Sequence, residues 1–520
     1  MLAFRWFGHE YELMKLAIIV GYSILLQGFA LAAVTLDVEG EDPLILADPV
    51  MKGLEKPKEG SPVEAAFQAF QAGDYEDAVA LAEPLAATGD ENAIYLLGFA
   101  HETGQGAKKS REMAIQYYEK GVVSGHAESL YRLSFLLMGS EKEEDAMKAQ
   151  KLLEKAAEKD PKVAGRILGE AFLRGAFTQN PSPESAVKWW KKASDSGDIP
   201  SMNYLARFYE GQLGFPEKRD TTQALDFYTK AAEEGDTTAM VNLASRLLNG
   251  EEKLRNEKKG REWITKAIEA GEPAAYFALG NFLEQVKKDP KAALAEYEKG
   301  VDAGQVDSML RAAALLINGG KGFDKNVVRV TALLKQAAEA GSAQAHLELA
   351  GLELNKDKPD VLAGYTHLLT AASGGLPFAQ NEIGIFYLSG KLGVSDVSAA
   401  VSWFGRAAQA NFAPAQNNLA ALHERGTGVP QSYENAIQLY TLAAQQGHPG
   451  ATLALARFQA AGAGTKQNME LAWALGKIAE ERGEIKAADL ISQLEEMLTT
   501  EQLASAKKEL EKIRSGNKAE

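Results

Sequence analysis

The sequence predicts an all-α protein, a right-handed solenoid of about twelve antiparallel helix pairs, each of about 36 residues. Two observations predict this fold. Gly, Asn or Asp recurs at steps of 33 to 38 residues along most of the chain, and the fourth residue after each of these positions is always Ala or Ser. A fixed period of this length is typical of repeats in which every helix pair buries its apolar faces against its neighbours.

The recurring positions, which we call the anchors, are the expected ends of helices. They are Gly89, Gly125, Asp160, Gly197, Gly235, Gly271, Gly304, Gly341, Gly375, Asn411, Gly447 and Gly483. The residue just past a helix commonly adopts the left-handed conformation, which Gly and Asn tolerate best. The small residues four positions later predict that two helices approach closely there.

Each unit is predicted to contain a first helix after its anchor and a second helix before the next anchor. Residues 379–388 and 415–424 are examples of first helices with apolar residues at helical spacing. The second helix has an aromatic residue seven positions before the next anchor in six units, and these rings should fill the space between successive pairs. They are Tyr118, Trp190, Tyr228, Tyr297, Phe404 and Tyr440.

Residues 1–33 are predicted to be a secretory signal peptide, with Met14 as the possible start. Lys15 precedes an apolar run that ends in the series Ala-Leu-Ala at 30–32, which suits cleavage near Ala33. The protein is therefore expected to be exported, to a periplasm or as a secreted protein. The alternative is a membrane anchor of residues 16–33, because this run approaches spanning length.

The composition limits the classes of function. The formal net charge is −15, so the surface as a whole should repel nucleic acid and anionic lipid. The chain contains no cysteine, which excludes disulfides, thiolate zinc sites, iron–sulfur clusters and cysteine nucleophiles.

One glycine loop could suggest phosphate binding. The segment 426–428, Gly-Thr-Gly, is too short for a phosphate-binding loop, has no strand before it and is not followed by Lys-Ser/Thr. We interpret it as an inter-helix turn that needs positive φ.

The histidines follow the repeat. His101 and His423 share one register position, and His126 and His448 share another. Because these histidines recur at fixed positions of the repeat, we interpret them as structural residues and not as catalytic ones.

His346 and His367 are expected to sit alone in different units. Neither an HExxH nor a GxSxG motif occurs in the chain. The sequence therefore predicts no catalytic residue, no metal ligand and no cofactor.

The unit reads A-x-x-x-L-A/G-x-x-x-x-x-G-x-G-V-x-x-x-x-x-x-A-x-x-x-Y-x-x-A-A-x-x-G, which resembles the Sel-one-like repeat (SLR), a relative of the tetratricopeptide repeat. In one unit the matching residues are Gly426, Gly428, Val429, Ala436, Tyr440, Ala443, Ala444 and Gly447. The resemblance extends from about residue 93 to residue 483. The region 253–304 lacks the Gly-x-Gly loop, and 139–160 has a charged segment instead, so we expect helix pairs there with different loops.

The composition, the capping pattern and the resemblance together divide the chain as follows. Residues 34–60 are an exposed linker, and residues 61–92 form an N-terminal tetratricopeptide-like capping unit. Residues 93–497 are the repeat solenoid, and residues 498–520 are a C-terminal capping helix and tail, with a helix start predicted at Thr499.

The resemblance also implies a function. Proteins of this architecture bind partners on a concave face lined by the first helices, so we expect a non-enzymatic scaffold or adaptor. Its partners would be other proteins or peptides of the cell envelope, with no nucleic acid and no small-molecule substrate, and a membrane only if the N-terminal segment is uncleaved.

Polar residues six, seven and ten positions after an anchor are candidates for partner binding, because Asn can bind a peptide backbone and Arg a carboxylate. They are Asn203, Tyr204, Arg207, Asn242, Asn381, Asn417 and Asn418. Two alternatives stay open. One is a structural component of the cell envelope. The other is a hydrolase such as a β-lactamase-like repeat protein, although those relatives resemble cysteine-rich forms.

Overall fold

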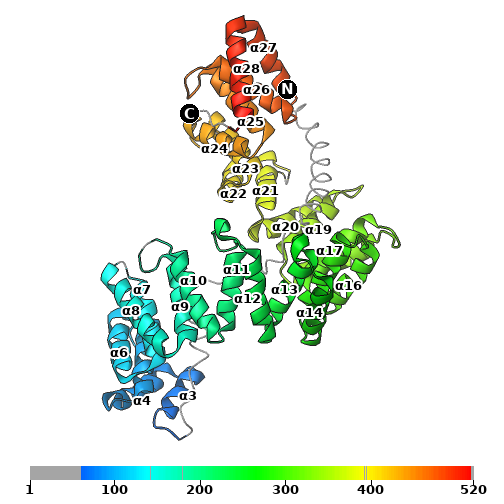
Figure 1. Ribbon diagram of the computed structural model, residues 1–520. Helices are drawn as coiled ribbons and strands as arrows, with labels where there is room; N and C mark the ends of the chain where they lie inside the picture. Colours follow the sequence, from blue (N-terminus) through cyan, green and yellow to red (C-terminus); the bar gives the residue numbers. More distant parts are fainter. Residues whose placement is uncertain (1–59, 141, 179, 392, 394, 517–520) are drawn as a thin grey trace. The chain divides into compact units, whose positions relative to one another are not determined.

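The computed structural model describes residues 60–140, 142–178, 180–391, 393 and 395–516, which form helices joined by loops, with no β-strand (Figure 1). The described part contains 26 α-helices and two short 3-10 helices. The predicted signal peptide and most of the predicted linker lie outside the described residues. No helix of the described part is long and apolar enough to span a bilayer.

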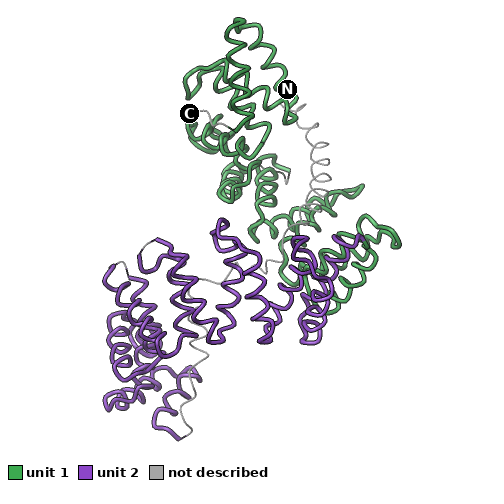
Figure 2. Tube along the Cα trace, in the orientation of Figure 1, with its two compact units in different colours: residues 1–30, 289–520 green, residues 31–288 purple. Residues whose placement is uncertain are grey.

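The described helices fall into two compact units, one within residues 31–288 and the other within 289–520 (Figure 2). The helices of the N-terminal unit are α3 (Glu64–Ala72), α4 (Tyr75–Ala87), α5 (Glu91–Thr103), α6 (Arg111–Ser124), α7 (Ala127–Met138), α8 (Glu143–Lys159), α9 (Pro161–Arg174), α10 (Pro183–Asp195), α11 (Ile199–Tyr209), α12 (Thr221–Glu233), α13 (Thr237–Asn249), α14 (Glu257–Glu269) and α15 (Ala274–Gln285). The two 3-10 helices, Pro216–Lys218 and Glu252–Leu254, lie in loops of this unit.

The helices of the C-terminal unit are α16 (Pro290–Asp302), α17 (Val306–Asn318), α18 (Val327–Glu339), α19 (Ala343–Leu354), α20 (Val361–Ser373), α21 (Pro377–Ser389), α22 (Val397–Gln409), α23 (Ala413–Arg425), α24 (Tyr433–Gln445), α25 (Pro449–Ala461), α26 (Met469–Glu481), α27 (Ala487–Met497) and α28 (Thr500–Arg514). Within each unit a helix packs chiefly against the helices that precede and follow it. This neighbour-on-neighbour packing confirms the predicted helical repeat architecture.

All twelve anchors lie just after the end of a helix, as predicted. Eleven of the twelve have positive φ, including Asn411 at 59°. Asp160 does not, because its φ is −133° and its side chain caps the next helix by accepting from the Lys162 N–H. The long helix α8 ends just before Asp160, as predicted, and the chain therefore passes into α9 without a left-handed residue.

The small residues four positions after the anchors are all fully buried, which confirms the predicted close approach of helices. The six aromatic residues of the second helices are buried as well. Opposite three of them a first helix has glycine: a Cβ at Gly98 would lie 2.6 Å from the Tyr118 ring, and one at Gly169 only 2.3 Å from the Trp190 ring. Gly384 meets Phe404 in the same way, so the large ring and the missing side chain complement each other.

The glycine loop at 426–428 is an inter-helix turn, as predicted. Gly426 and Gly428 have φ of 65° and 72°. The regions without this loop still form helices, since α8 covers much of 139–160 and α14, α15 and α16 cover much of 253–304.

The two ends of the described chain are also helical. Residues 61–92 contain α3, α4 and the start of α5, with Gly73 in the left-handed conformation between the first two. At the other end, Thr499 and Gln502 form a capping box at the start of α28, which confirms the helix start predicted there.

Candidate partner-binding face

Four of the predicted binding residues lie on two neighbouring first helices of the N-terminal unit. Asn203, Tyr204 and Arg207 are on α11, and Asn242 is on α13, and all four are partly exposed. Arg207 forms no ion pair with a described residue, and the side chain of Asn242 forms no hydrogen bond within the described part of the chain. The buried Oδ1 of Asn203 has no hydrogen-bond partner there either.

Tyr204 differs from these three because the fold itself uses its ring. The ring stacks on Trp190, with the centroids 5.2 Å apart and the planes at 10°. Its hydroxyl interacts electrostatically with the Glu170 carboxyl of α9, and burial raises the pKa of this phenol. Tyr204 therefore joins three helices, α9, α10 and α11, and its primary role is in packing rather than in partner binding.

Glu170 is a residue of this face that the sequence analysis missed. It is only 4% exposed, and burial raises the pKa of its carboxyl to about 7, although Arg174 and Arg166 act in the opposite direction. Its Oε1 has no hydrogen-bond partner in the described part. Glu170 stands ten positions after its anchor, in the same register as Arg207, so its position could have been found from the sequence. It was missed because the candidate residues were chosen as hydrogen-bond donors, and a carboxylate is an acceptor.

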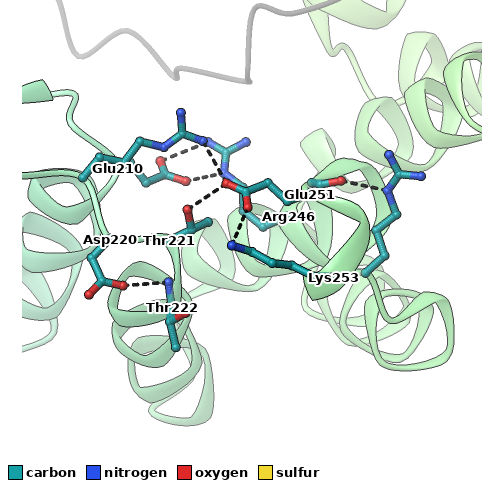
Figure 3. Close-up of polar contacts among 10 residues, drawn as sticks. Glu210, Asp220, Thr221, Thr222, Arg246, Glu251 and Lys253 are labelled. Carbon is teal, nitrogen blue, oxygen red and sulfur yellow. Dashed lines mark hydrogen bonds and ion pairs between the residues drawn. The ribbon is translucent and has the colours of Figure 1, made fainter. Parts of the chain in front are cut away.

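Acidic residues at the ends of first helices bind neighbouring helices together. The Tyr228 hydroxyl donates to Glu210 at 3.1 Å. Arg246 of α13 donates from two nitrogens to the same carboxylate (Figure 3). Each such bridge joins a second helix to the next first helix. The positive charge of the arginine in such a bridge is already neutralised by the carboxylate.

The same bridge recurs in other units. Tyr118 donates to Glu102 at 2.5 Å, and Arg132 of α7 forms an ion pair with that carboxylate at 3.4 Å. In the C-terminal unit the tyrosine part of the bridge recurs, because Tyr440 donates to Glu424 at 2.7 Å. These repeated carboxylates are structural features of the unit.

Polar contacts near Glu210 extend to the loop that follows α13. Figure 3 shows Glu251 between the Thr221 hydroxyl, which donates to it at 3.2 Å, and Lys253, which pairs with it at 3.1 Å. These exposed groups hold the start of α12 against the loop, and they leave Arg207 and Asn242 uninvolved.

In the C-terminal unit the predicted asparagines are engaged with each other. Asn381 is buried, accepts from the Asn418 side-chain amide at 2.9 Å and donates to Glu382 at 3.1 Å. Burial raises the pKa of the Glu382 carboxyl. Asn381 and Asn418 therefore link α21 to α23, and of the three predicted residues Asn417 is partly exposed and forms no hydrogen bond within the described part.

Histidines at equivalent register positions have structural roles. His126 and His448 cap α7 and α25 by accepting from backbone N–H groups, and burial lowers the pKa of both imidazoles. The Nδ1 of His101 is 3.0 Å from the carbonyl of Lys108 in the following loop.

His346 and His367 were predicted to sit alone in different units, and this is wrong. They lie on α19 and α20 of one helix pair, with their Nδ1 atoms 3.0 Å apart. Antiparallel packing brings the two positions together, although 21 residues separate them. Burial lowers the pKa of both imidazoles. Among the described residues, no group of three or more His, Asp or Glu side chains could hold a metal ion.

Comparison with protein-family models shows to which family the chain belongs. The Sel1 repeat model matches nine segments that together cover more than half of the chain: 92–122, 127–161, 166–198, 199–236, 237–272, 273–305, 377–412, 413–448 and 449–484. The chain belongs to the Sel1 repeat family. The unmatched residues 306–376 contain α17 to α20, which continue the helical pattern of this Sel1 repeat protein.

Curated relatives of this Sel1 repeat protein include two fungal regulators. It is 27% identical over 236 residues to chitin synthase regulator SKT5 of Saccharomyces cerevisiae and 25% identical over 259 residues to chitin synthase regulatory factor 3 of Schizosaccharomyces pombe. The alignments cover 42% and 41% of this chain. They span only 33% and 28% of those relatives.

Solved structures of similar proteins include two bacterial repeat proteins. One is c5321, a protective antigen of uropathogenic Escherichia coli with an SLR fold, at 22% identity and a TM-score of 0.47, covering 82% of this chain and 92% of that one. The other is a Sel1 repeat protein from Oxalobacter formigenes, at 23% identity and a TM-score of 0.43, covering 62% of this chain and 93% of that one.

Proposed function

We propose that this Sel1 repeat protein is a non-enzymatic scaffold that binds partner proteins or peptides on the first-helix face of its N-terminal unit. One observation carries the proposal. Arg207 and Asn242, on adjacent first helices, are partly exposed and make no polar contact of the kind that occupies Arg132 on α7 and Arg246 on α13.

The chemistry of these residues suits an extended acidic segment. An unpaired guanidinium can bind a carboxylate through two parallel hydrogen bonds, and an asparagine amide offers a peptide backbone one donor and one acceptor. With Asn203 beside them, α11 and α13 would contact successive residues of such a segment. The names of the two fungal relatives describe regulators, and a protein that acts by binding another protein fits that description.

The C-terminal unit contributes less to this proposal. Asn381 and Asn418 are used to join α21 and α23, so Asn417 is the residue of that set with polar groups to offer. We therefore place the principal contacts on α11 and α13 rather than spreading them evenly along the chain.

Export to the cell envelope is part of the proposal. It is supported by Lys15, the apolar run after it and the small residues before Ala33. Intact mass of the protein purified from its native host tests this point. A chain that begins near Ala33 in a soluble envelope fraction supports export. A membrane-bound chain that retains residues 16–33 supports the alternative of a membrane-spanning segment.

The binding face is tested with a partner identified by crosslinking in the native host. Asn203→Ala, Arg207→Ala and Asn242→Ala together should weaken the affinity by tenfold or more, because neutral hydrogen bonds contribute about 1 kcal/mol each and charged ones about 1.5–3 kcal/mol. The melting temperature should stay unchanged, since none of these side chains has a polar partner in the fold.

A matched control lies on α8. Lys151, Lys155 and Glu158 are exposed on this second helix and form no polar contact with the described residues. Their combined replacement by Ala should leave the affinity unchanged. Equal affinities for the parent and the α11–α13 variant would contradict the proposed face.

A further inference from the structure

A groove opens between two second helices of the N-terminal unit, α12 and α14. Its cavity volume is about 310 Å³. Leu243 and Leu247 of α13 form its floor, and Leu225 and Trp263 form its apolar walls. The rim is polar and consists of Thr229, Glu233, Lys259, Glu262 and Lys266. The groove is thus built mainly by second helices, whereas the face proposed above belongs to first helices.

The preceding repeat shows why this space is open. Tyr209 stands twelve positions after Gly197, is buried, and stacks on Phe227 with the centroids 6.0 Å apart and the planes at 4°. Leu247 stands twelve positions after Gly235, so it occupies the register of Tyr209, and Trp263 occupies the register of Phe227. Where one repeat has a stacked ring, the next has a leucine, and Trp263 is left half-buried beside the gap.

The charges on the rim are also less satisfied than in the preceding repeat. Asp226 and Lys230 of α12 form an ion pair at 2.9 Å, but the residues at the same register of α14, Glu262 and Lys266, do not pair. Lys266 lies over the Trp263 ring at 4.0 Å from its centroid, as Lys230 lies over the Phe227 ring at 4.8 Å.

The two remaining rim charges are free as well. Glu233 and Lys259 are exposed and form no ion pair with any residue in the described ranges. Charges of both signs therefore border an apolar floor. A half-exposed tryptophan in such surroundings is typical of a contact that contributes much of a binding energy.

We propose that this groove binds one aromatic side chain, a Phe or Tyr, which a partner protein presents between an acidic and a basic residue. The ring would lie over Leu247 and stack beside Trp263, as the chain's own Tyr209 stacks on Phe227. The neighbouring carboxylate would face Lys259, and the amine would face Glu233.

The probe is acetyl-Glu-Phe-Lys-amide, compared with acetyl-Glu-Ala-Lys-amide. Saturation-transfer NMR with the full chain should show saturable binding of the phenylalanine peptide at millimolar affinity, as expected of a ligand of this size, and at least about tenfold weaker binding of the alanine peptide. Equal binding of the two peptides, or no saturation up to about 10 mM, would overturn the proposal.

Filling the groove is the decisive variant. Leu247→Tyr restores the ring that the preceding repeat has, so it should fold and should weaken the phenylalanine peptide at least about tenfold. The control Leu362→Tyr adds the same ring at a site that is 68% exposed on α20, and should leave binding unchanged. Unchanged affinity of the Leu247→Tyr protein would contradict the assigned groove.

Two further measurements keep the test independent of folding and of the first-helix face. If circular dichroism shows that Leu247→Tyr is unfolded, Trp263→Ala takes its place, with the same loss expected and the same contradiction if affinity is retained. The variant Asn203→Ala/Arg207→Ala/Asn242→Ala should bind the peptide like the parent. Loss of peptide binding in that variant would assign the peptide to the first-helix face and overturn the groove.

Discussion

At the residue scale, the small side chains around each anchor decide how closely the helices pack. Ala443 of α24, four positions before Gly447, is fully buried. Ala443→Leu adds three carbons to a filled contact and should lower the free energy of unfolding by about 1–3 kcal/mol. Urea denaturation followed by circular dichroism measures this change.

The control for Ala443 is His423→Ala. The buried Nδ1 of His423 has no hydrogen-bond partner in the described part, so removing the ring should cost little by comparison. Equal shifts of the unfolding midpoint in the two variants would show that the alanine step does not hold the helix pair.

Glu170 predicts a dependence of stability on pH. Its carboxyl has a pKa of about 7 in the folded chain, against an ordinary value of 4.5, because it is buried. Between these values the unfolded chain releases a proton that the folded chain retains, so this group's contribution to stability falls as the pH rises. Above pH 7 the folded chain holds a buried carboxylate.

Glu170→Gln removes that ionisation. The variant should be more stable than the parent at pH 8, by up to about 3 kcal/mol, and the difference should shrink toward pH 5. Thermal unfolding at the two pH values measures it, with the exposed Glu158→Gln on α8 as control. A gain that does not depend on pH would contradict the assigned ionisation.

The residues that the sequence could predict were those fixed by the period. The anchors and the buried small residues recur in twelve copies and the second-helix aromatics in six, all at constant spacing, so the repetition reveals each role. Glu170, the contact of Asn381 with Asn418 and the pairing of His346 with His367 occur once each, and they depend on how far one helix is displaced along its neighbour. That displacement is a property of packing, which spacing along the chain does not report.

At the element scale, the second glycine of the Gly-x-Gly loops allows consecutive helix pairs to approach closely. A Cβ at Gly428 would lie 2.4 Å from Val397, one at Gly464 would lie 2.6 Å from Tyr433, and one at Gly106 would lie 2.1 Å from the Tyr75 carbonyl. Tyr75, Val397 and Tyr433 are the first residues of α4, α22 and α24. Each loop therefore rests on the start of the second helix of the preceding pair.

This contact can be separated from backbone strain. Gly428 and Gly447 both have positive φ, but a Cβ at Gly447 would meet no atom within 4 Å. Gly447→Ala should cost about 1–2 kcal/mol for the left-handed conformation alone. Gly428→Ala should cost at least about 1 kcal/mol more, because the loop must also move away from Val397.

Urea denaturation of the two glycine variants gives the comparison. Equal losses of stability in the two variants would mean that the loop does not contact the start of α22. The sequence predicted that these glycines need positive φ, but it could not show which helix they touch, because that helix belongs to the preceding unit. Asp160 ends α8 without a positive φ because its side chain caps α9, which its place in the period does not reveal.

At the scale of the whole molecule, packing between sequence neighbours predicts that the chain tolerates truncation. Stability of such an array is approximately a sum over units and their interfaces. A protein that ends at Gly447, and so lacks α25 to α28, should remain soluble and helical. Its mean residue ellipticity should stay close to that of the full chain.

The truncated chain should still melt cooperatively, at a somewhat lower temperature, because α24 loses the helix that covers it. Circular dichroism melts of both chains measure the difference. Loss of helical signal throughout the truncated protein would show that the last helices stabilise the whole chain.

The nearest-neighbour arrangement of helices also determines when folding can begin. Each helix finds its partners within about one repeat of chain, so the loops that must close are short and folding should be fast for a protein of this length. A chain that emerges N-terminus first, from a ribosome or through a translocation pore, can complete each helix pair as soon as the next one has emerged. Because the sequence has no cysteine, no oxidation step has to follow.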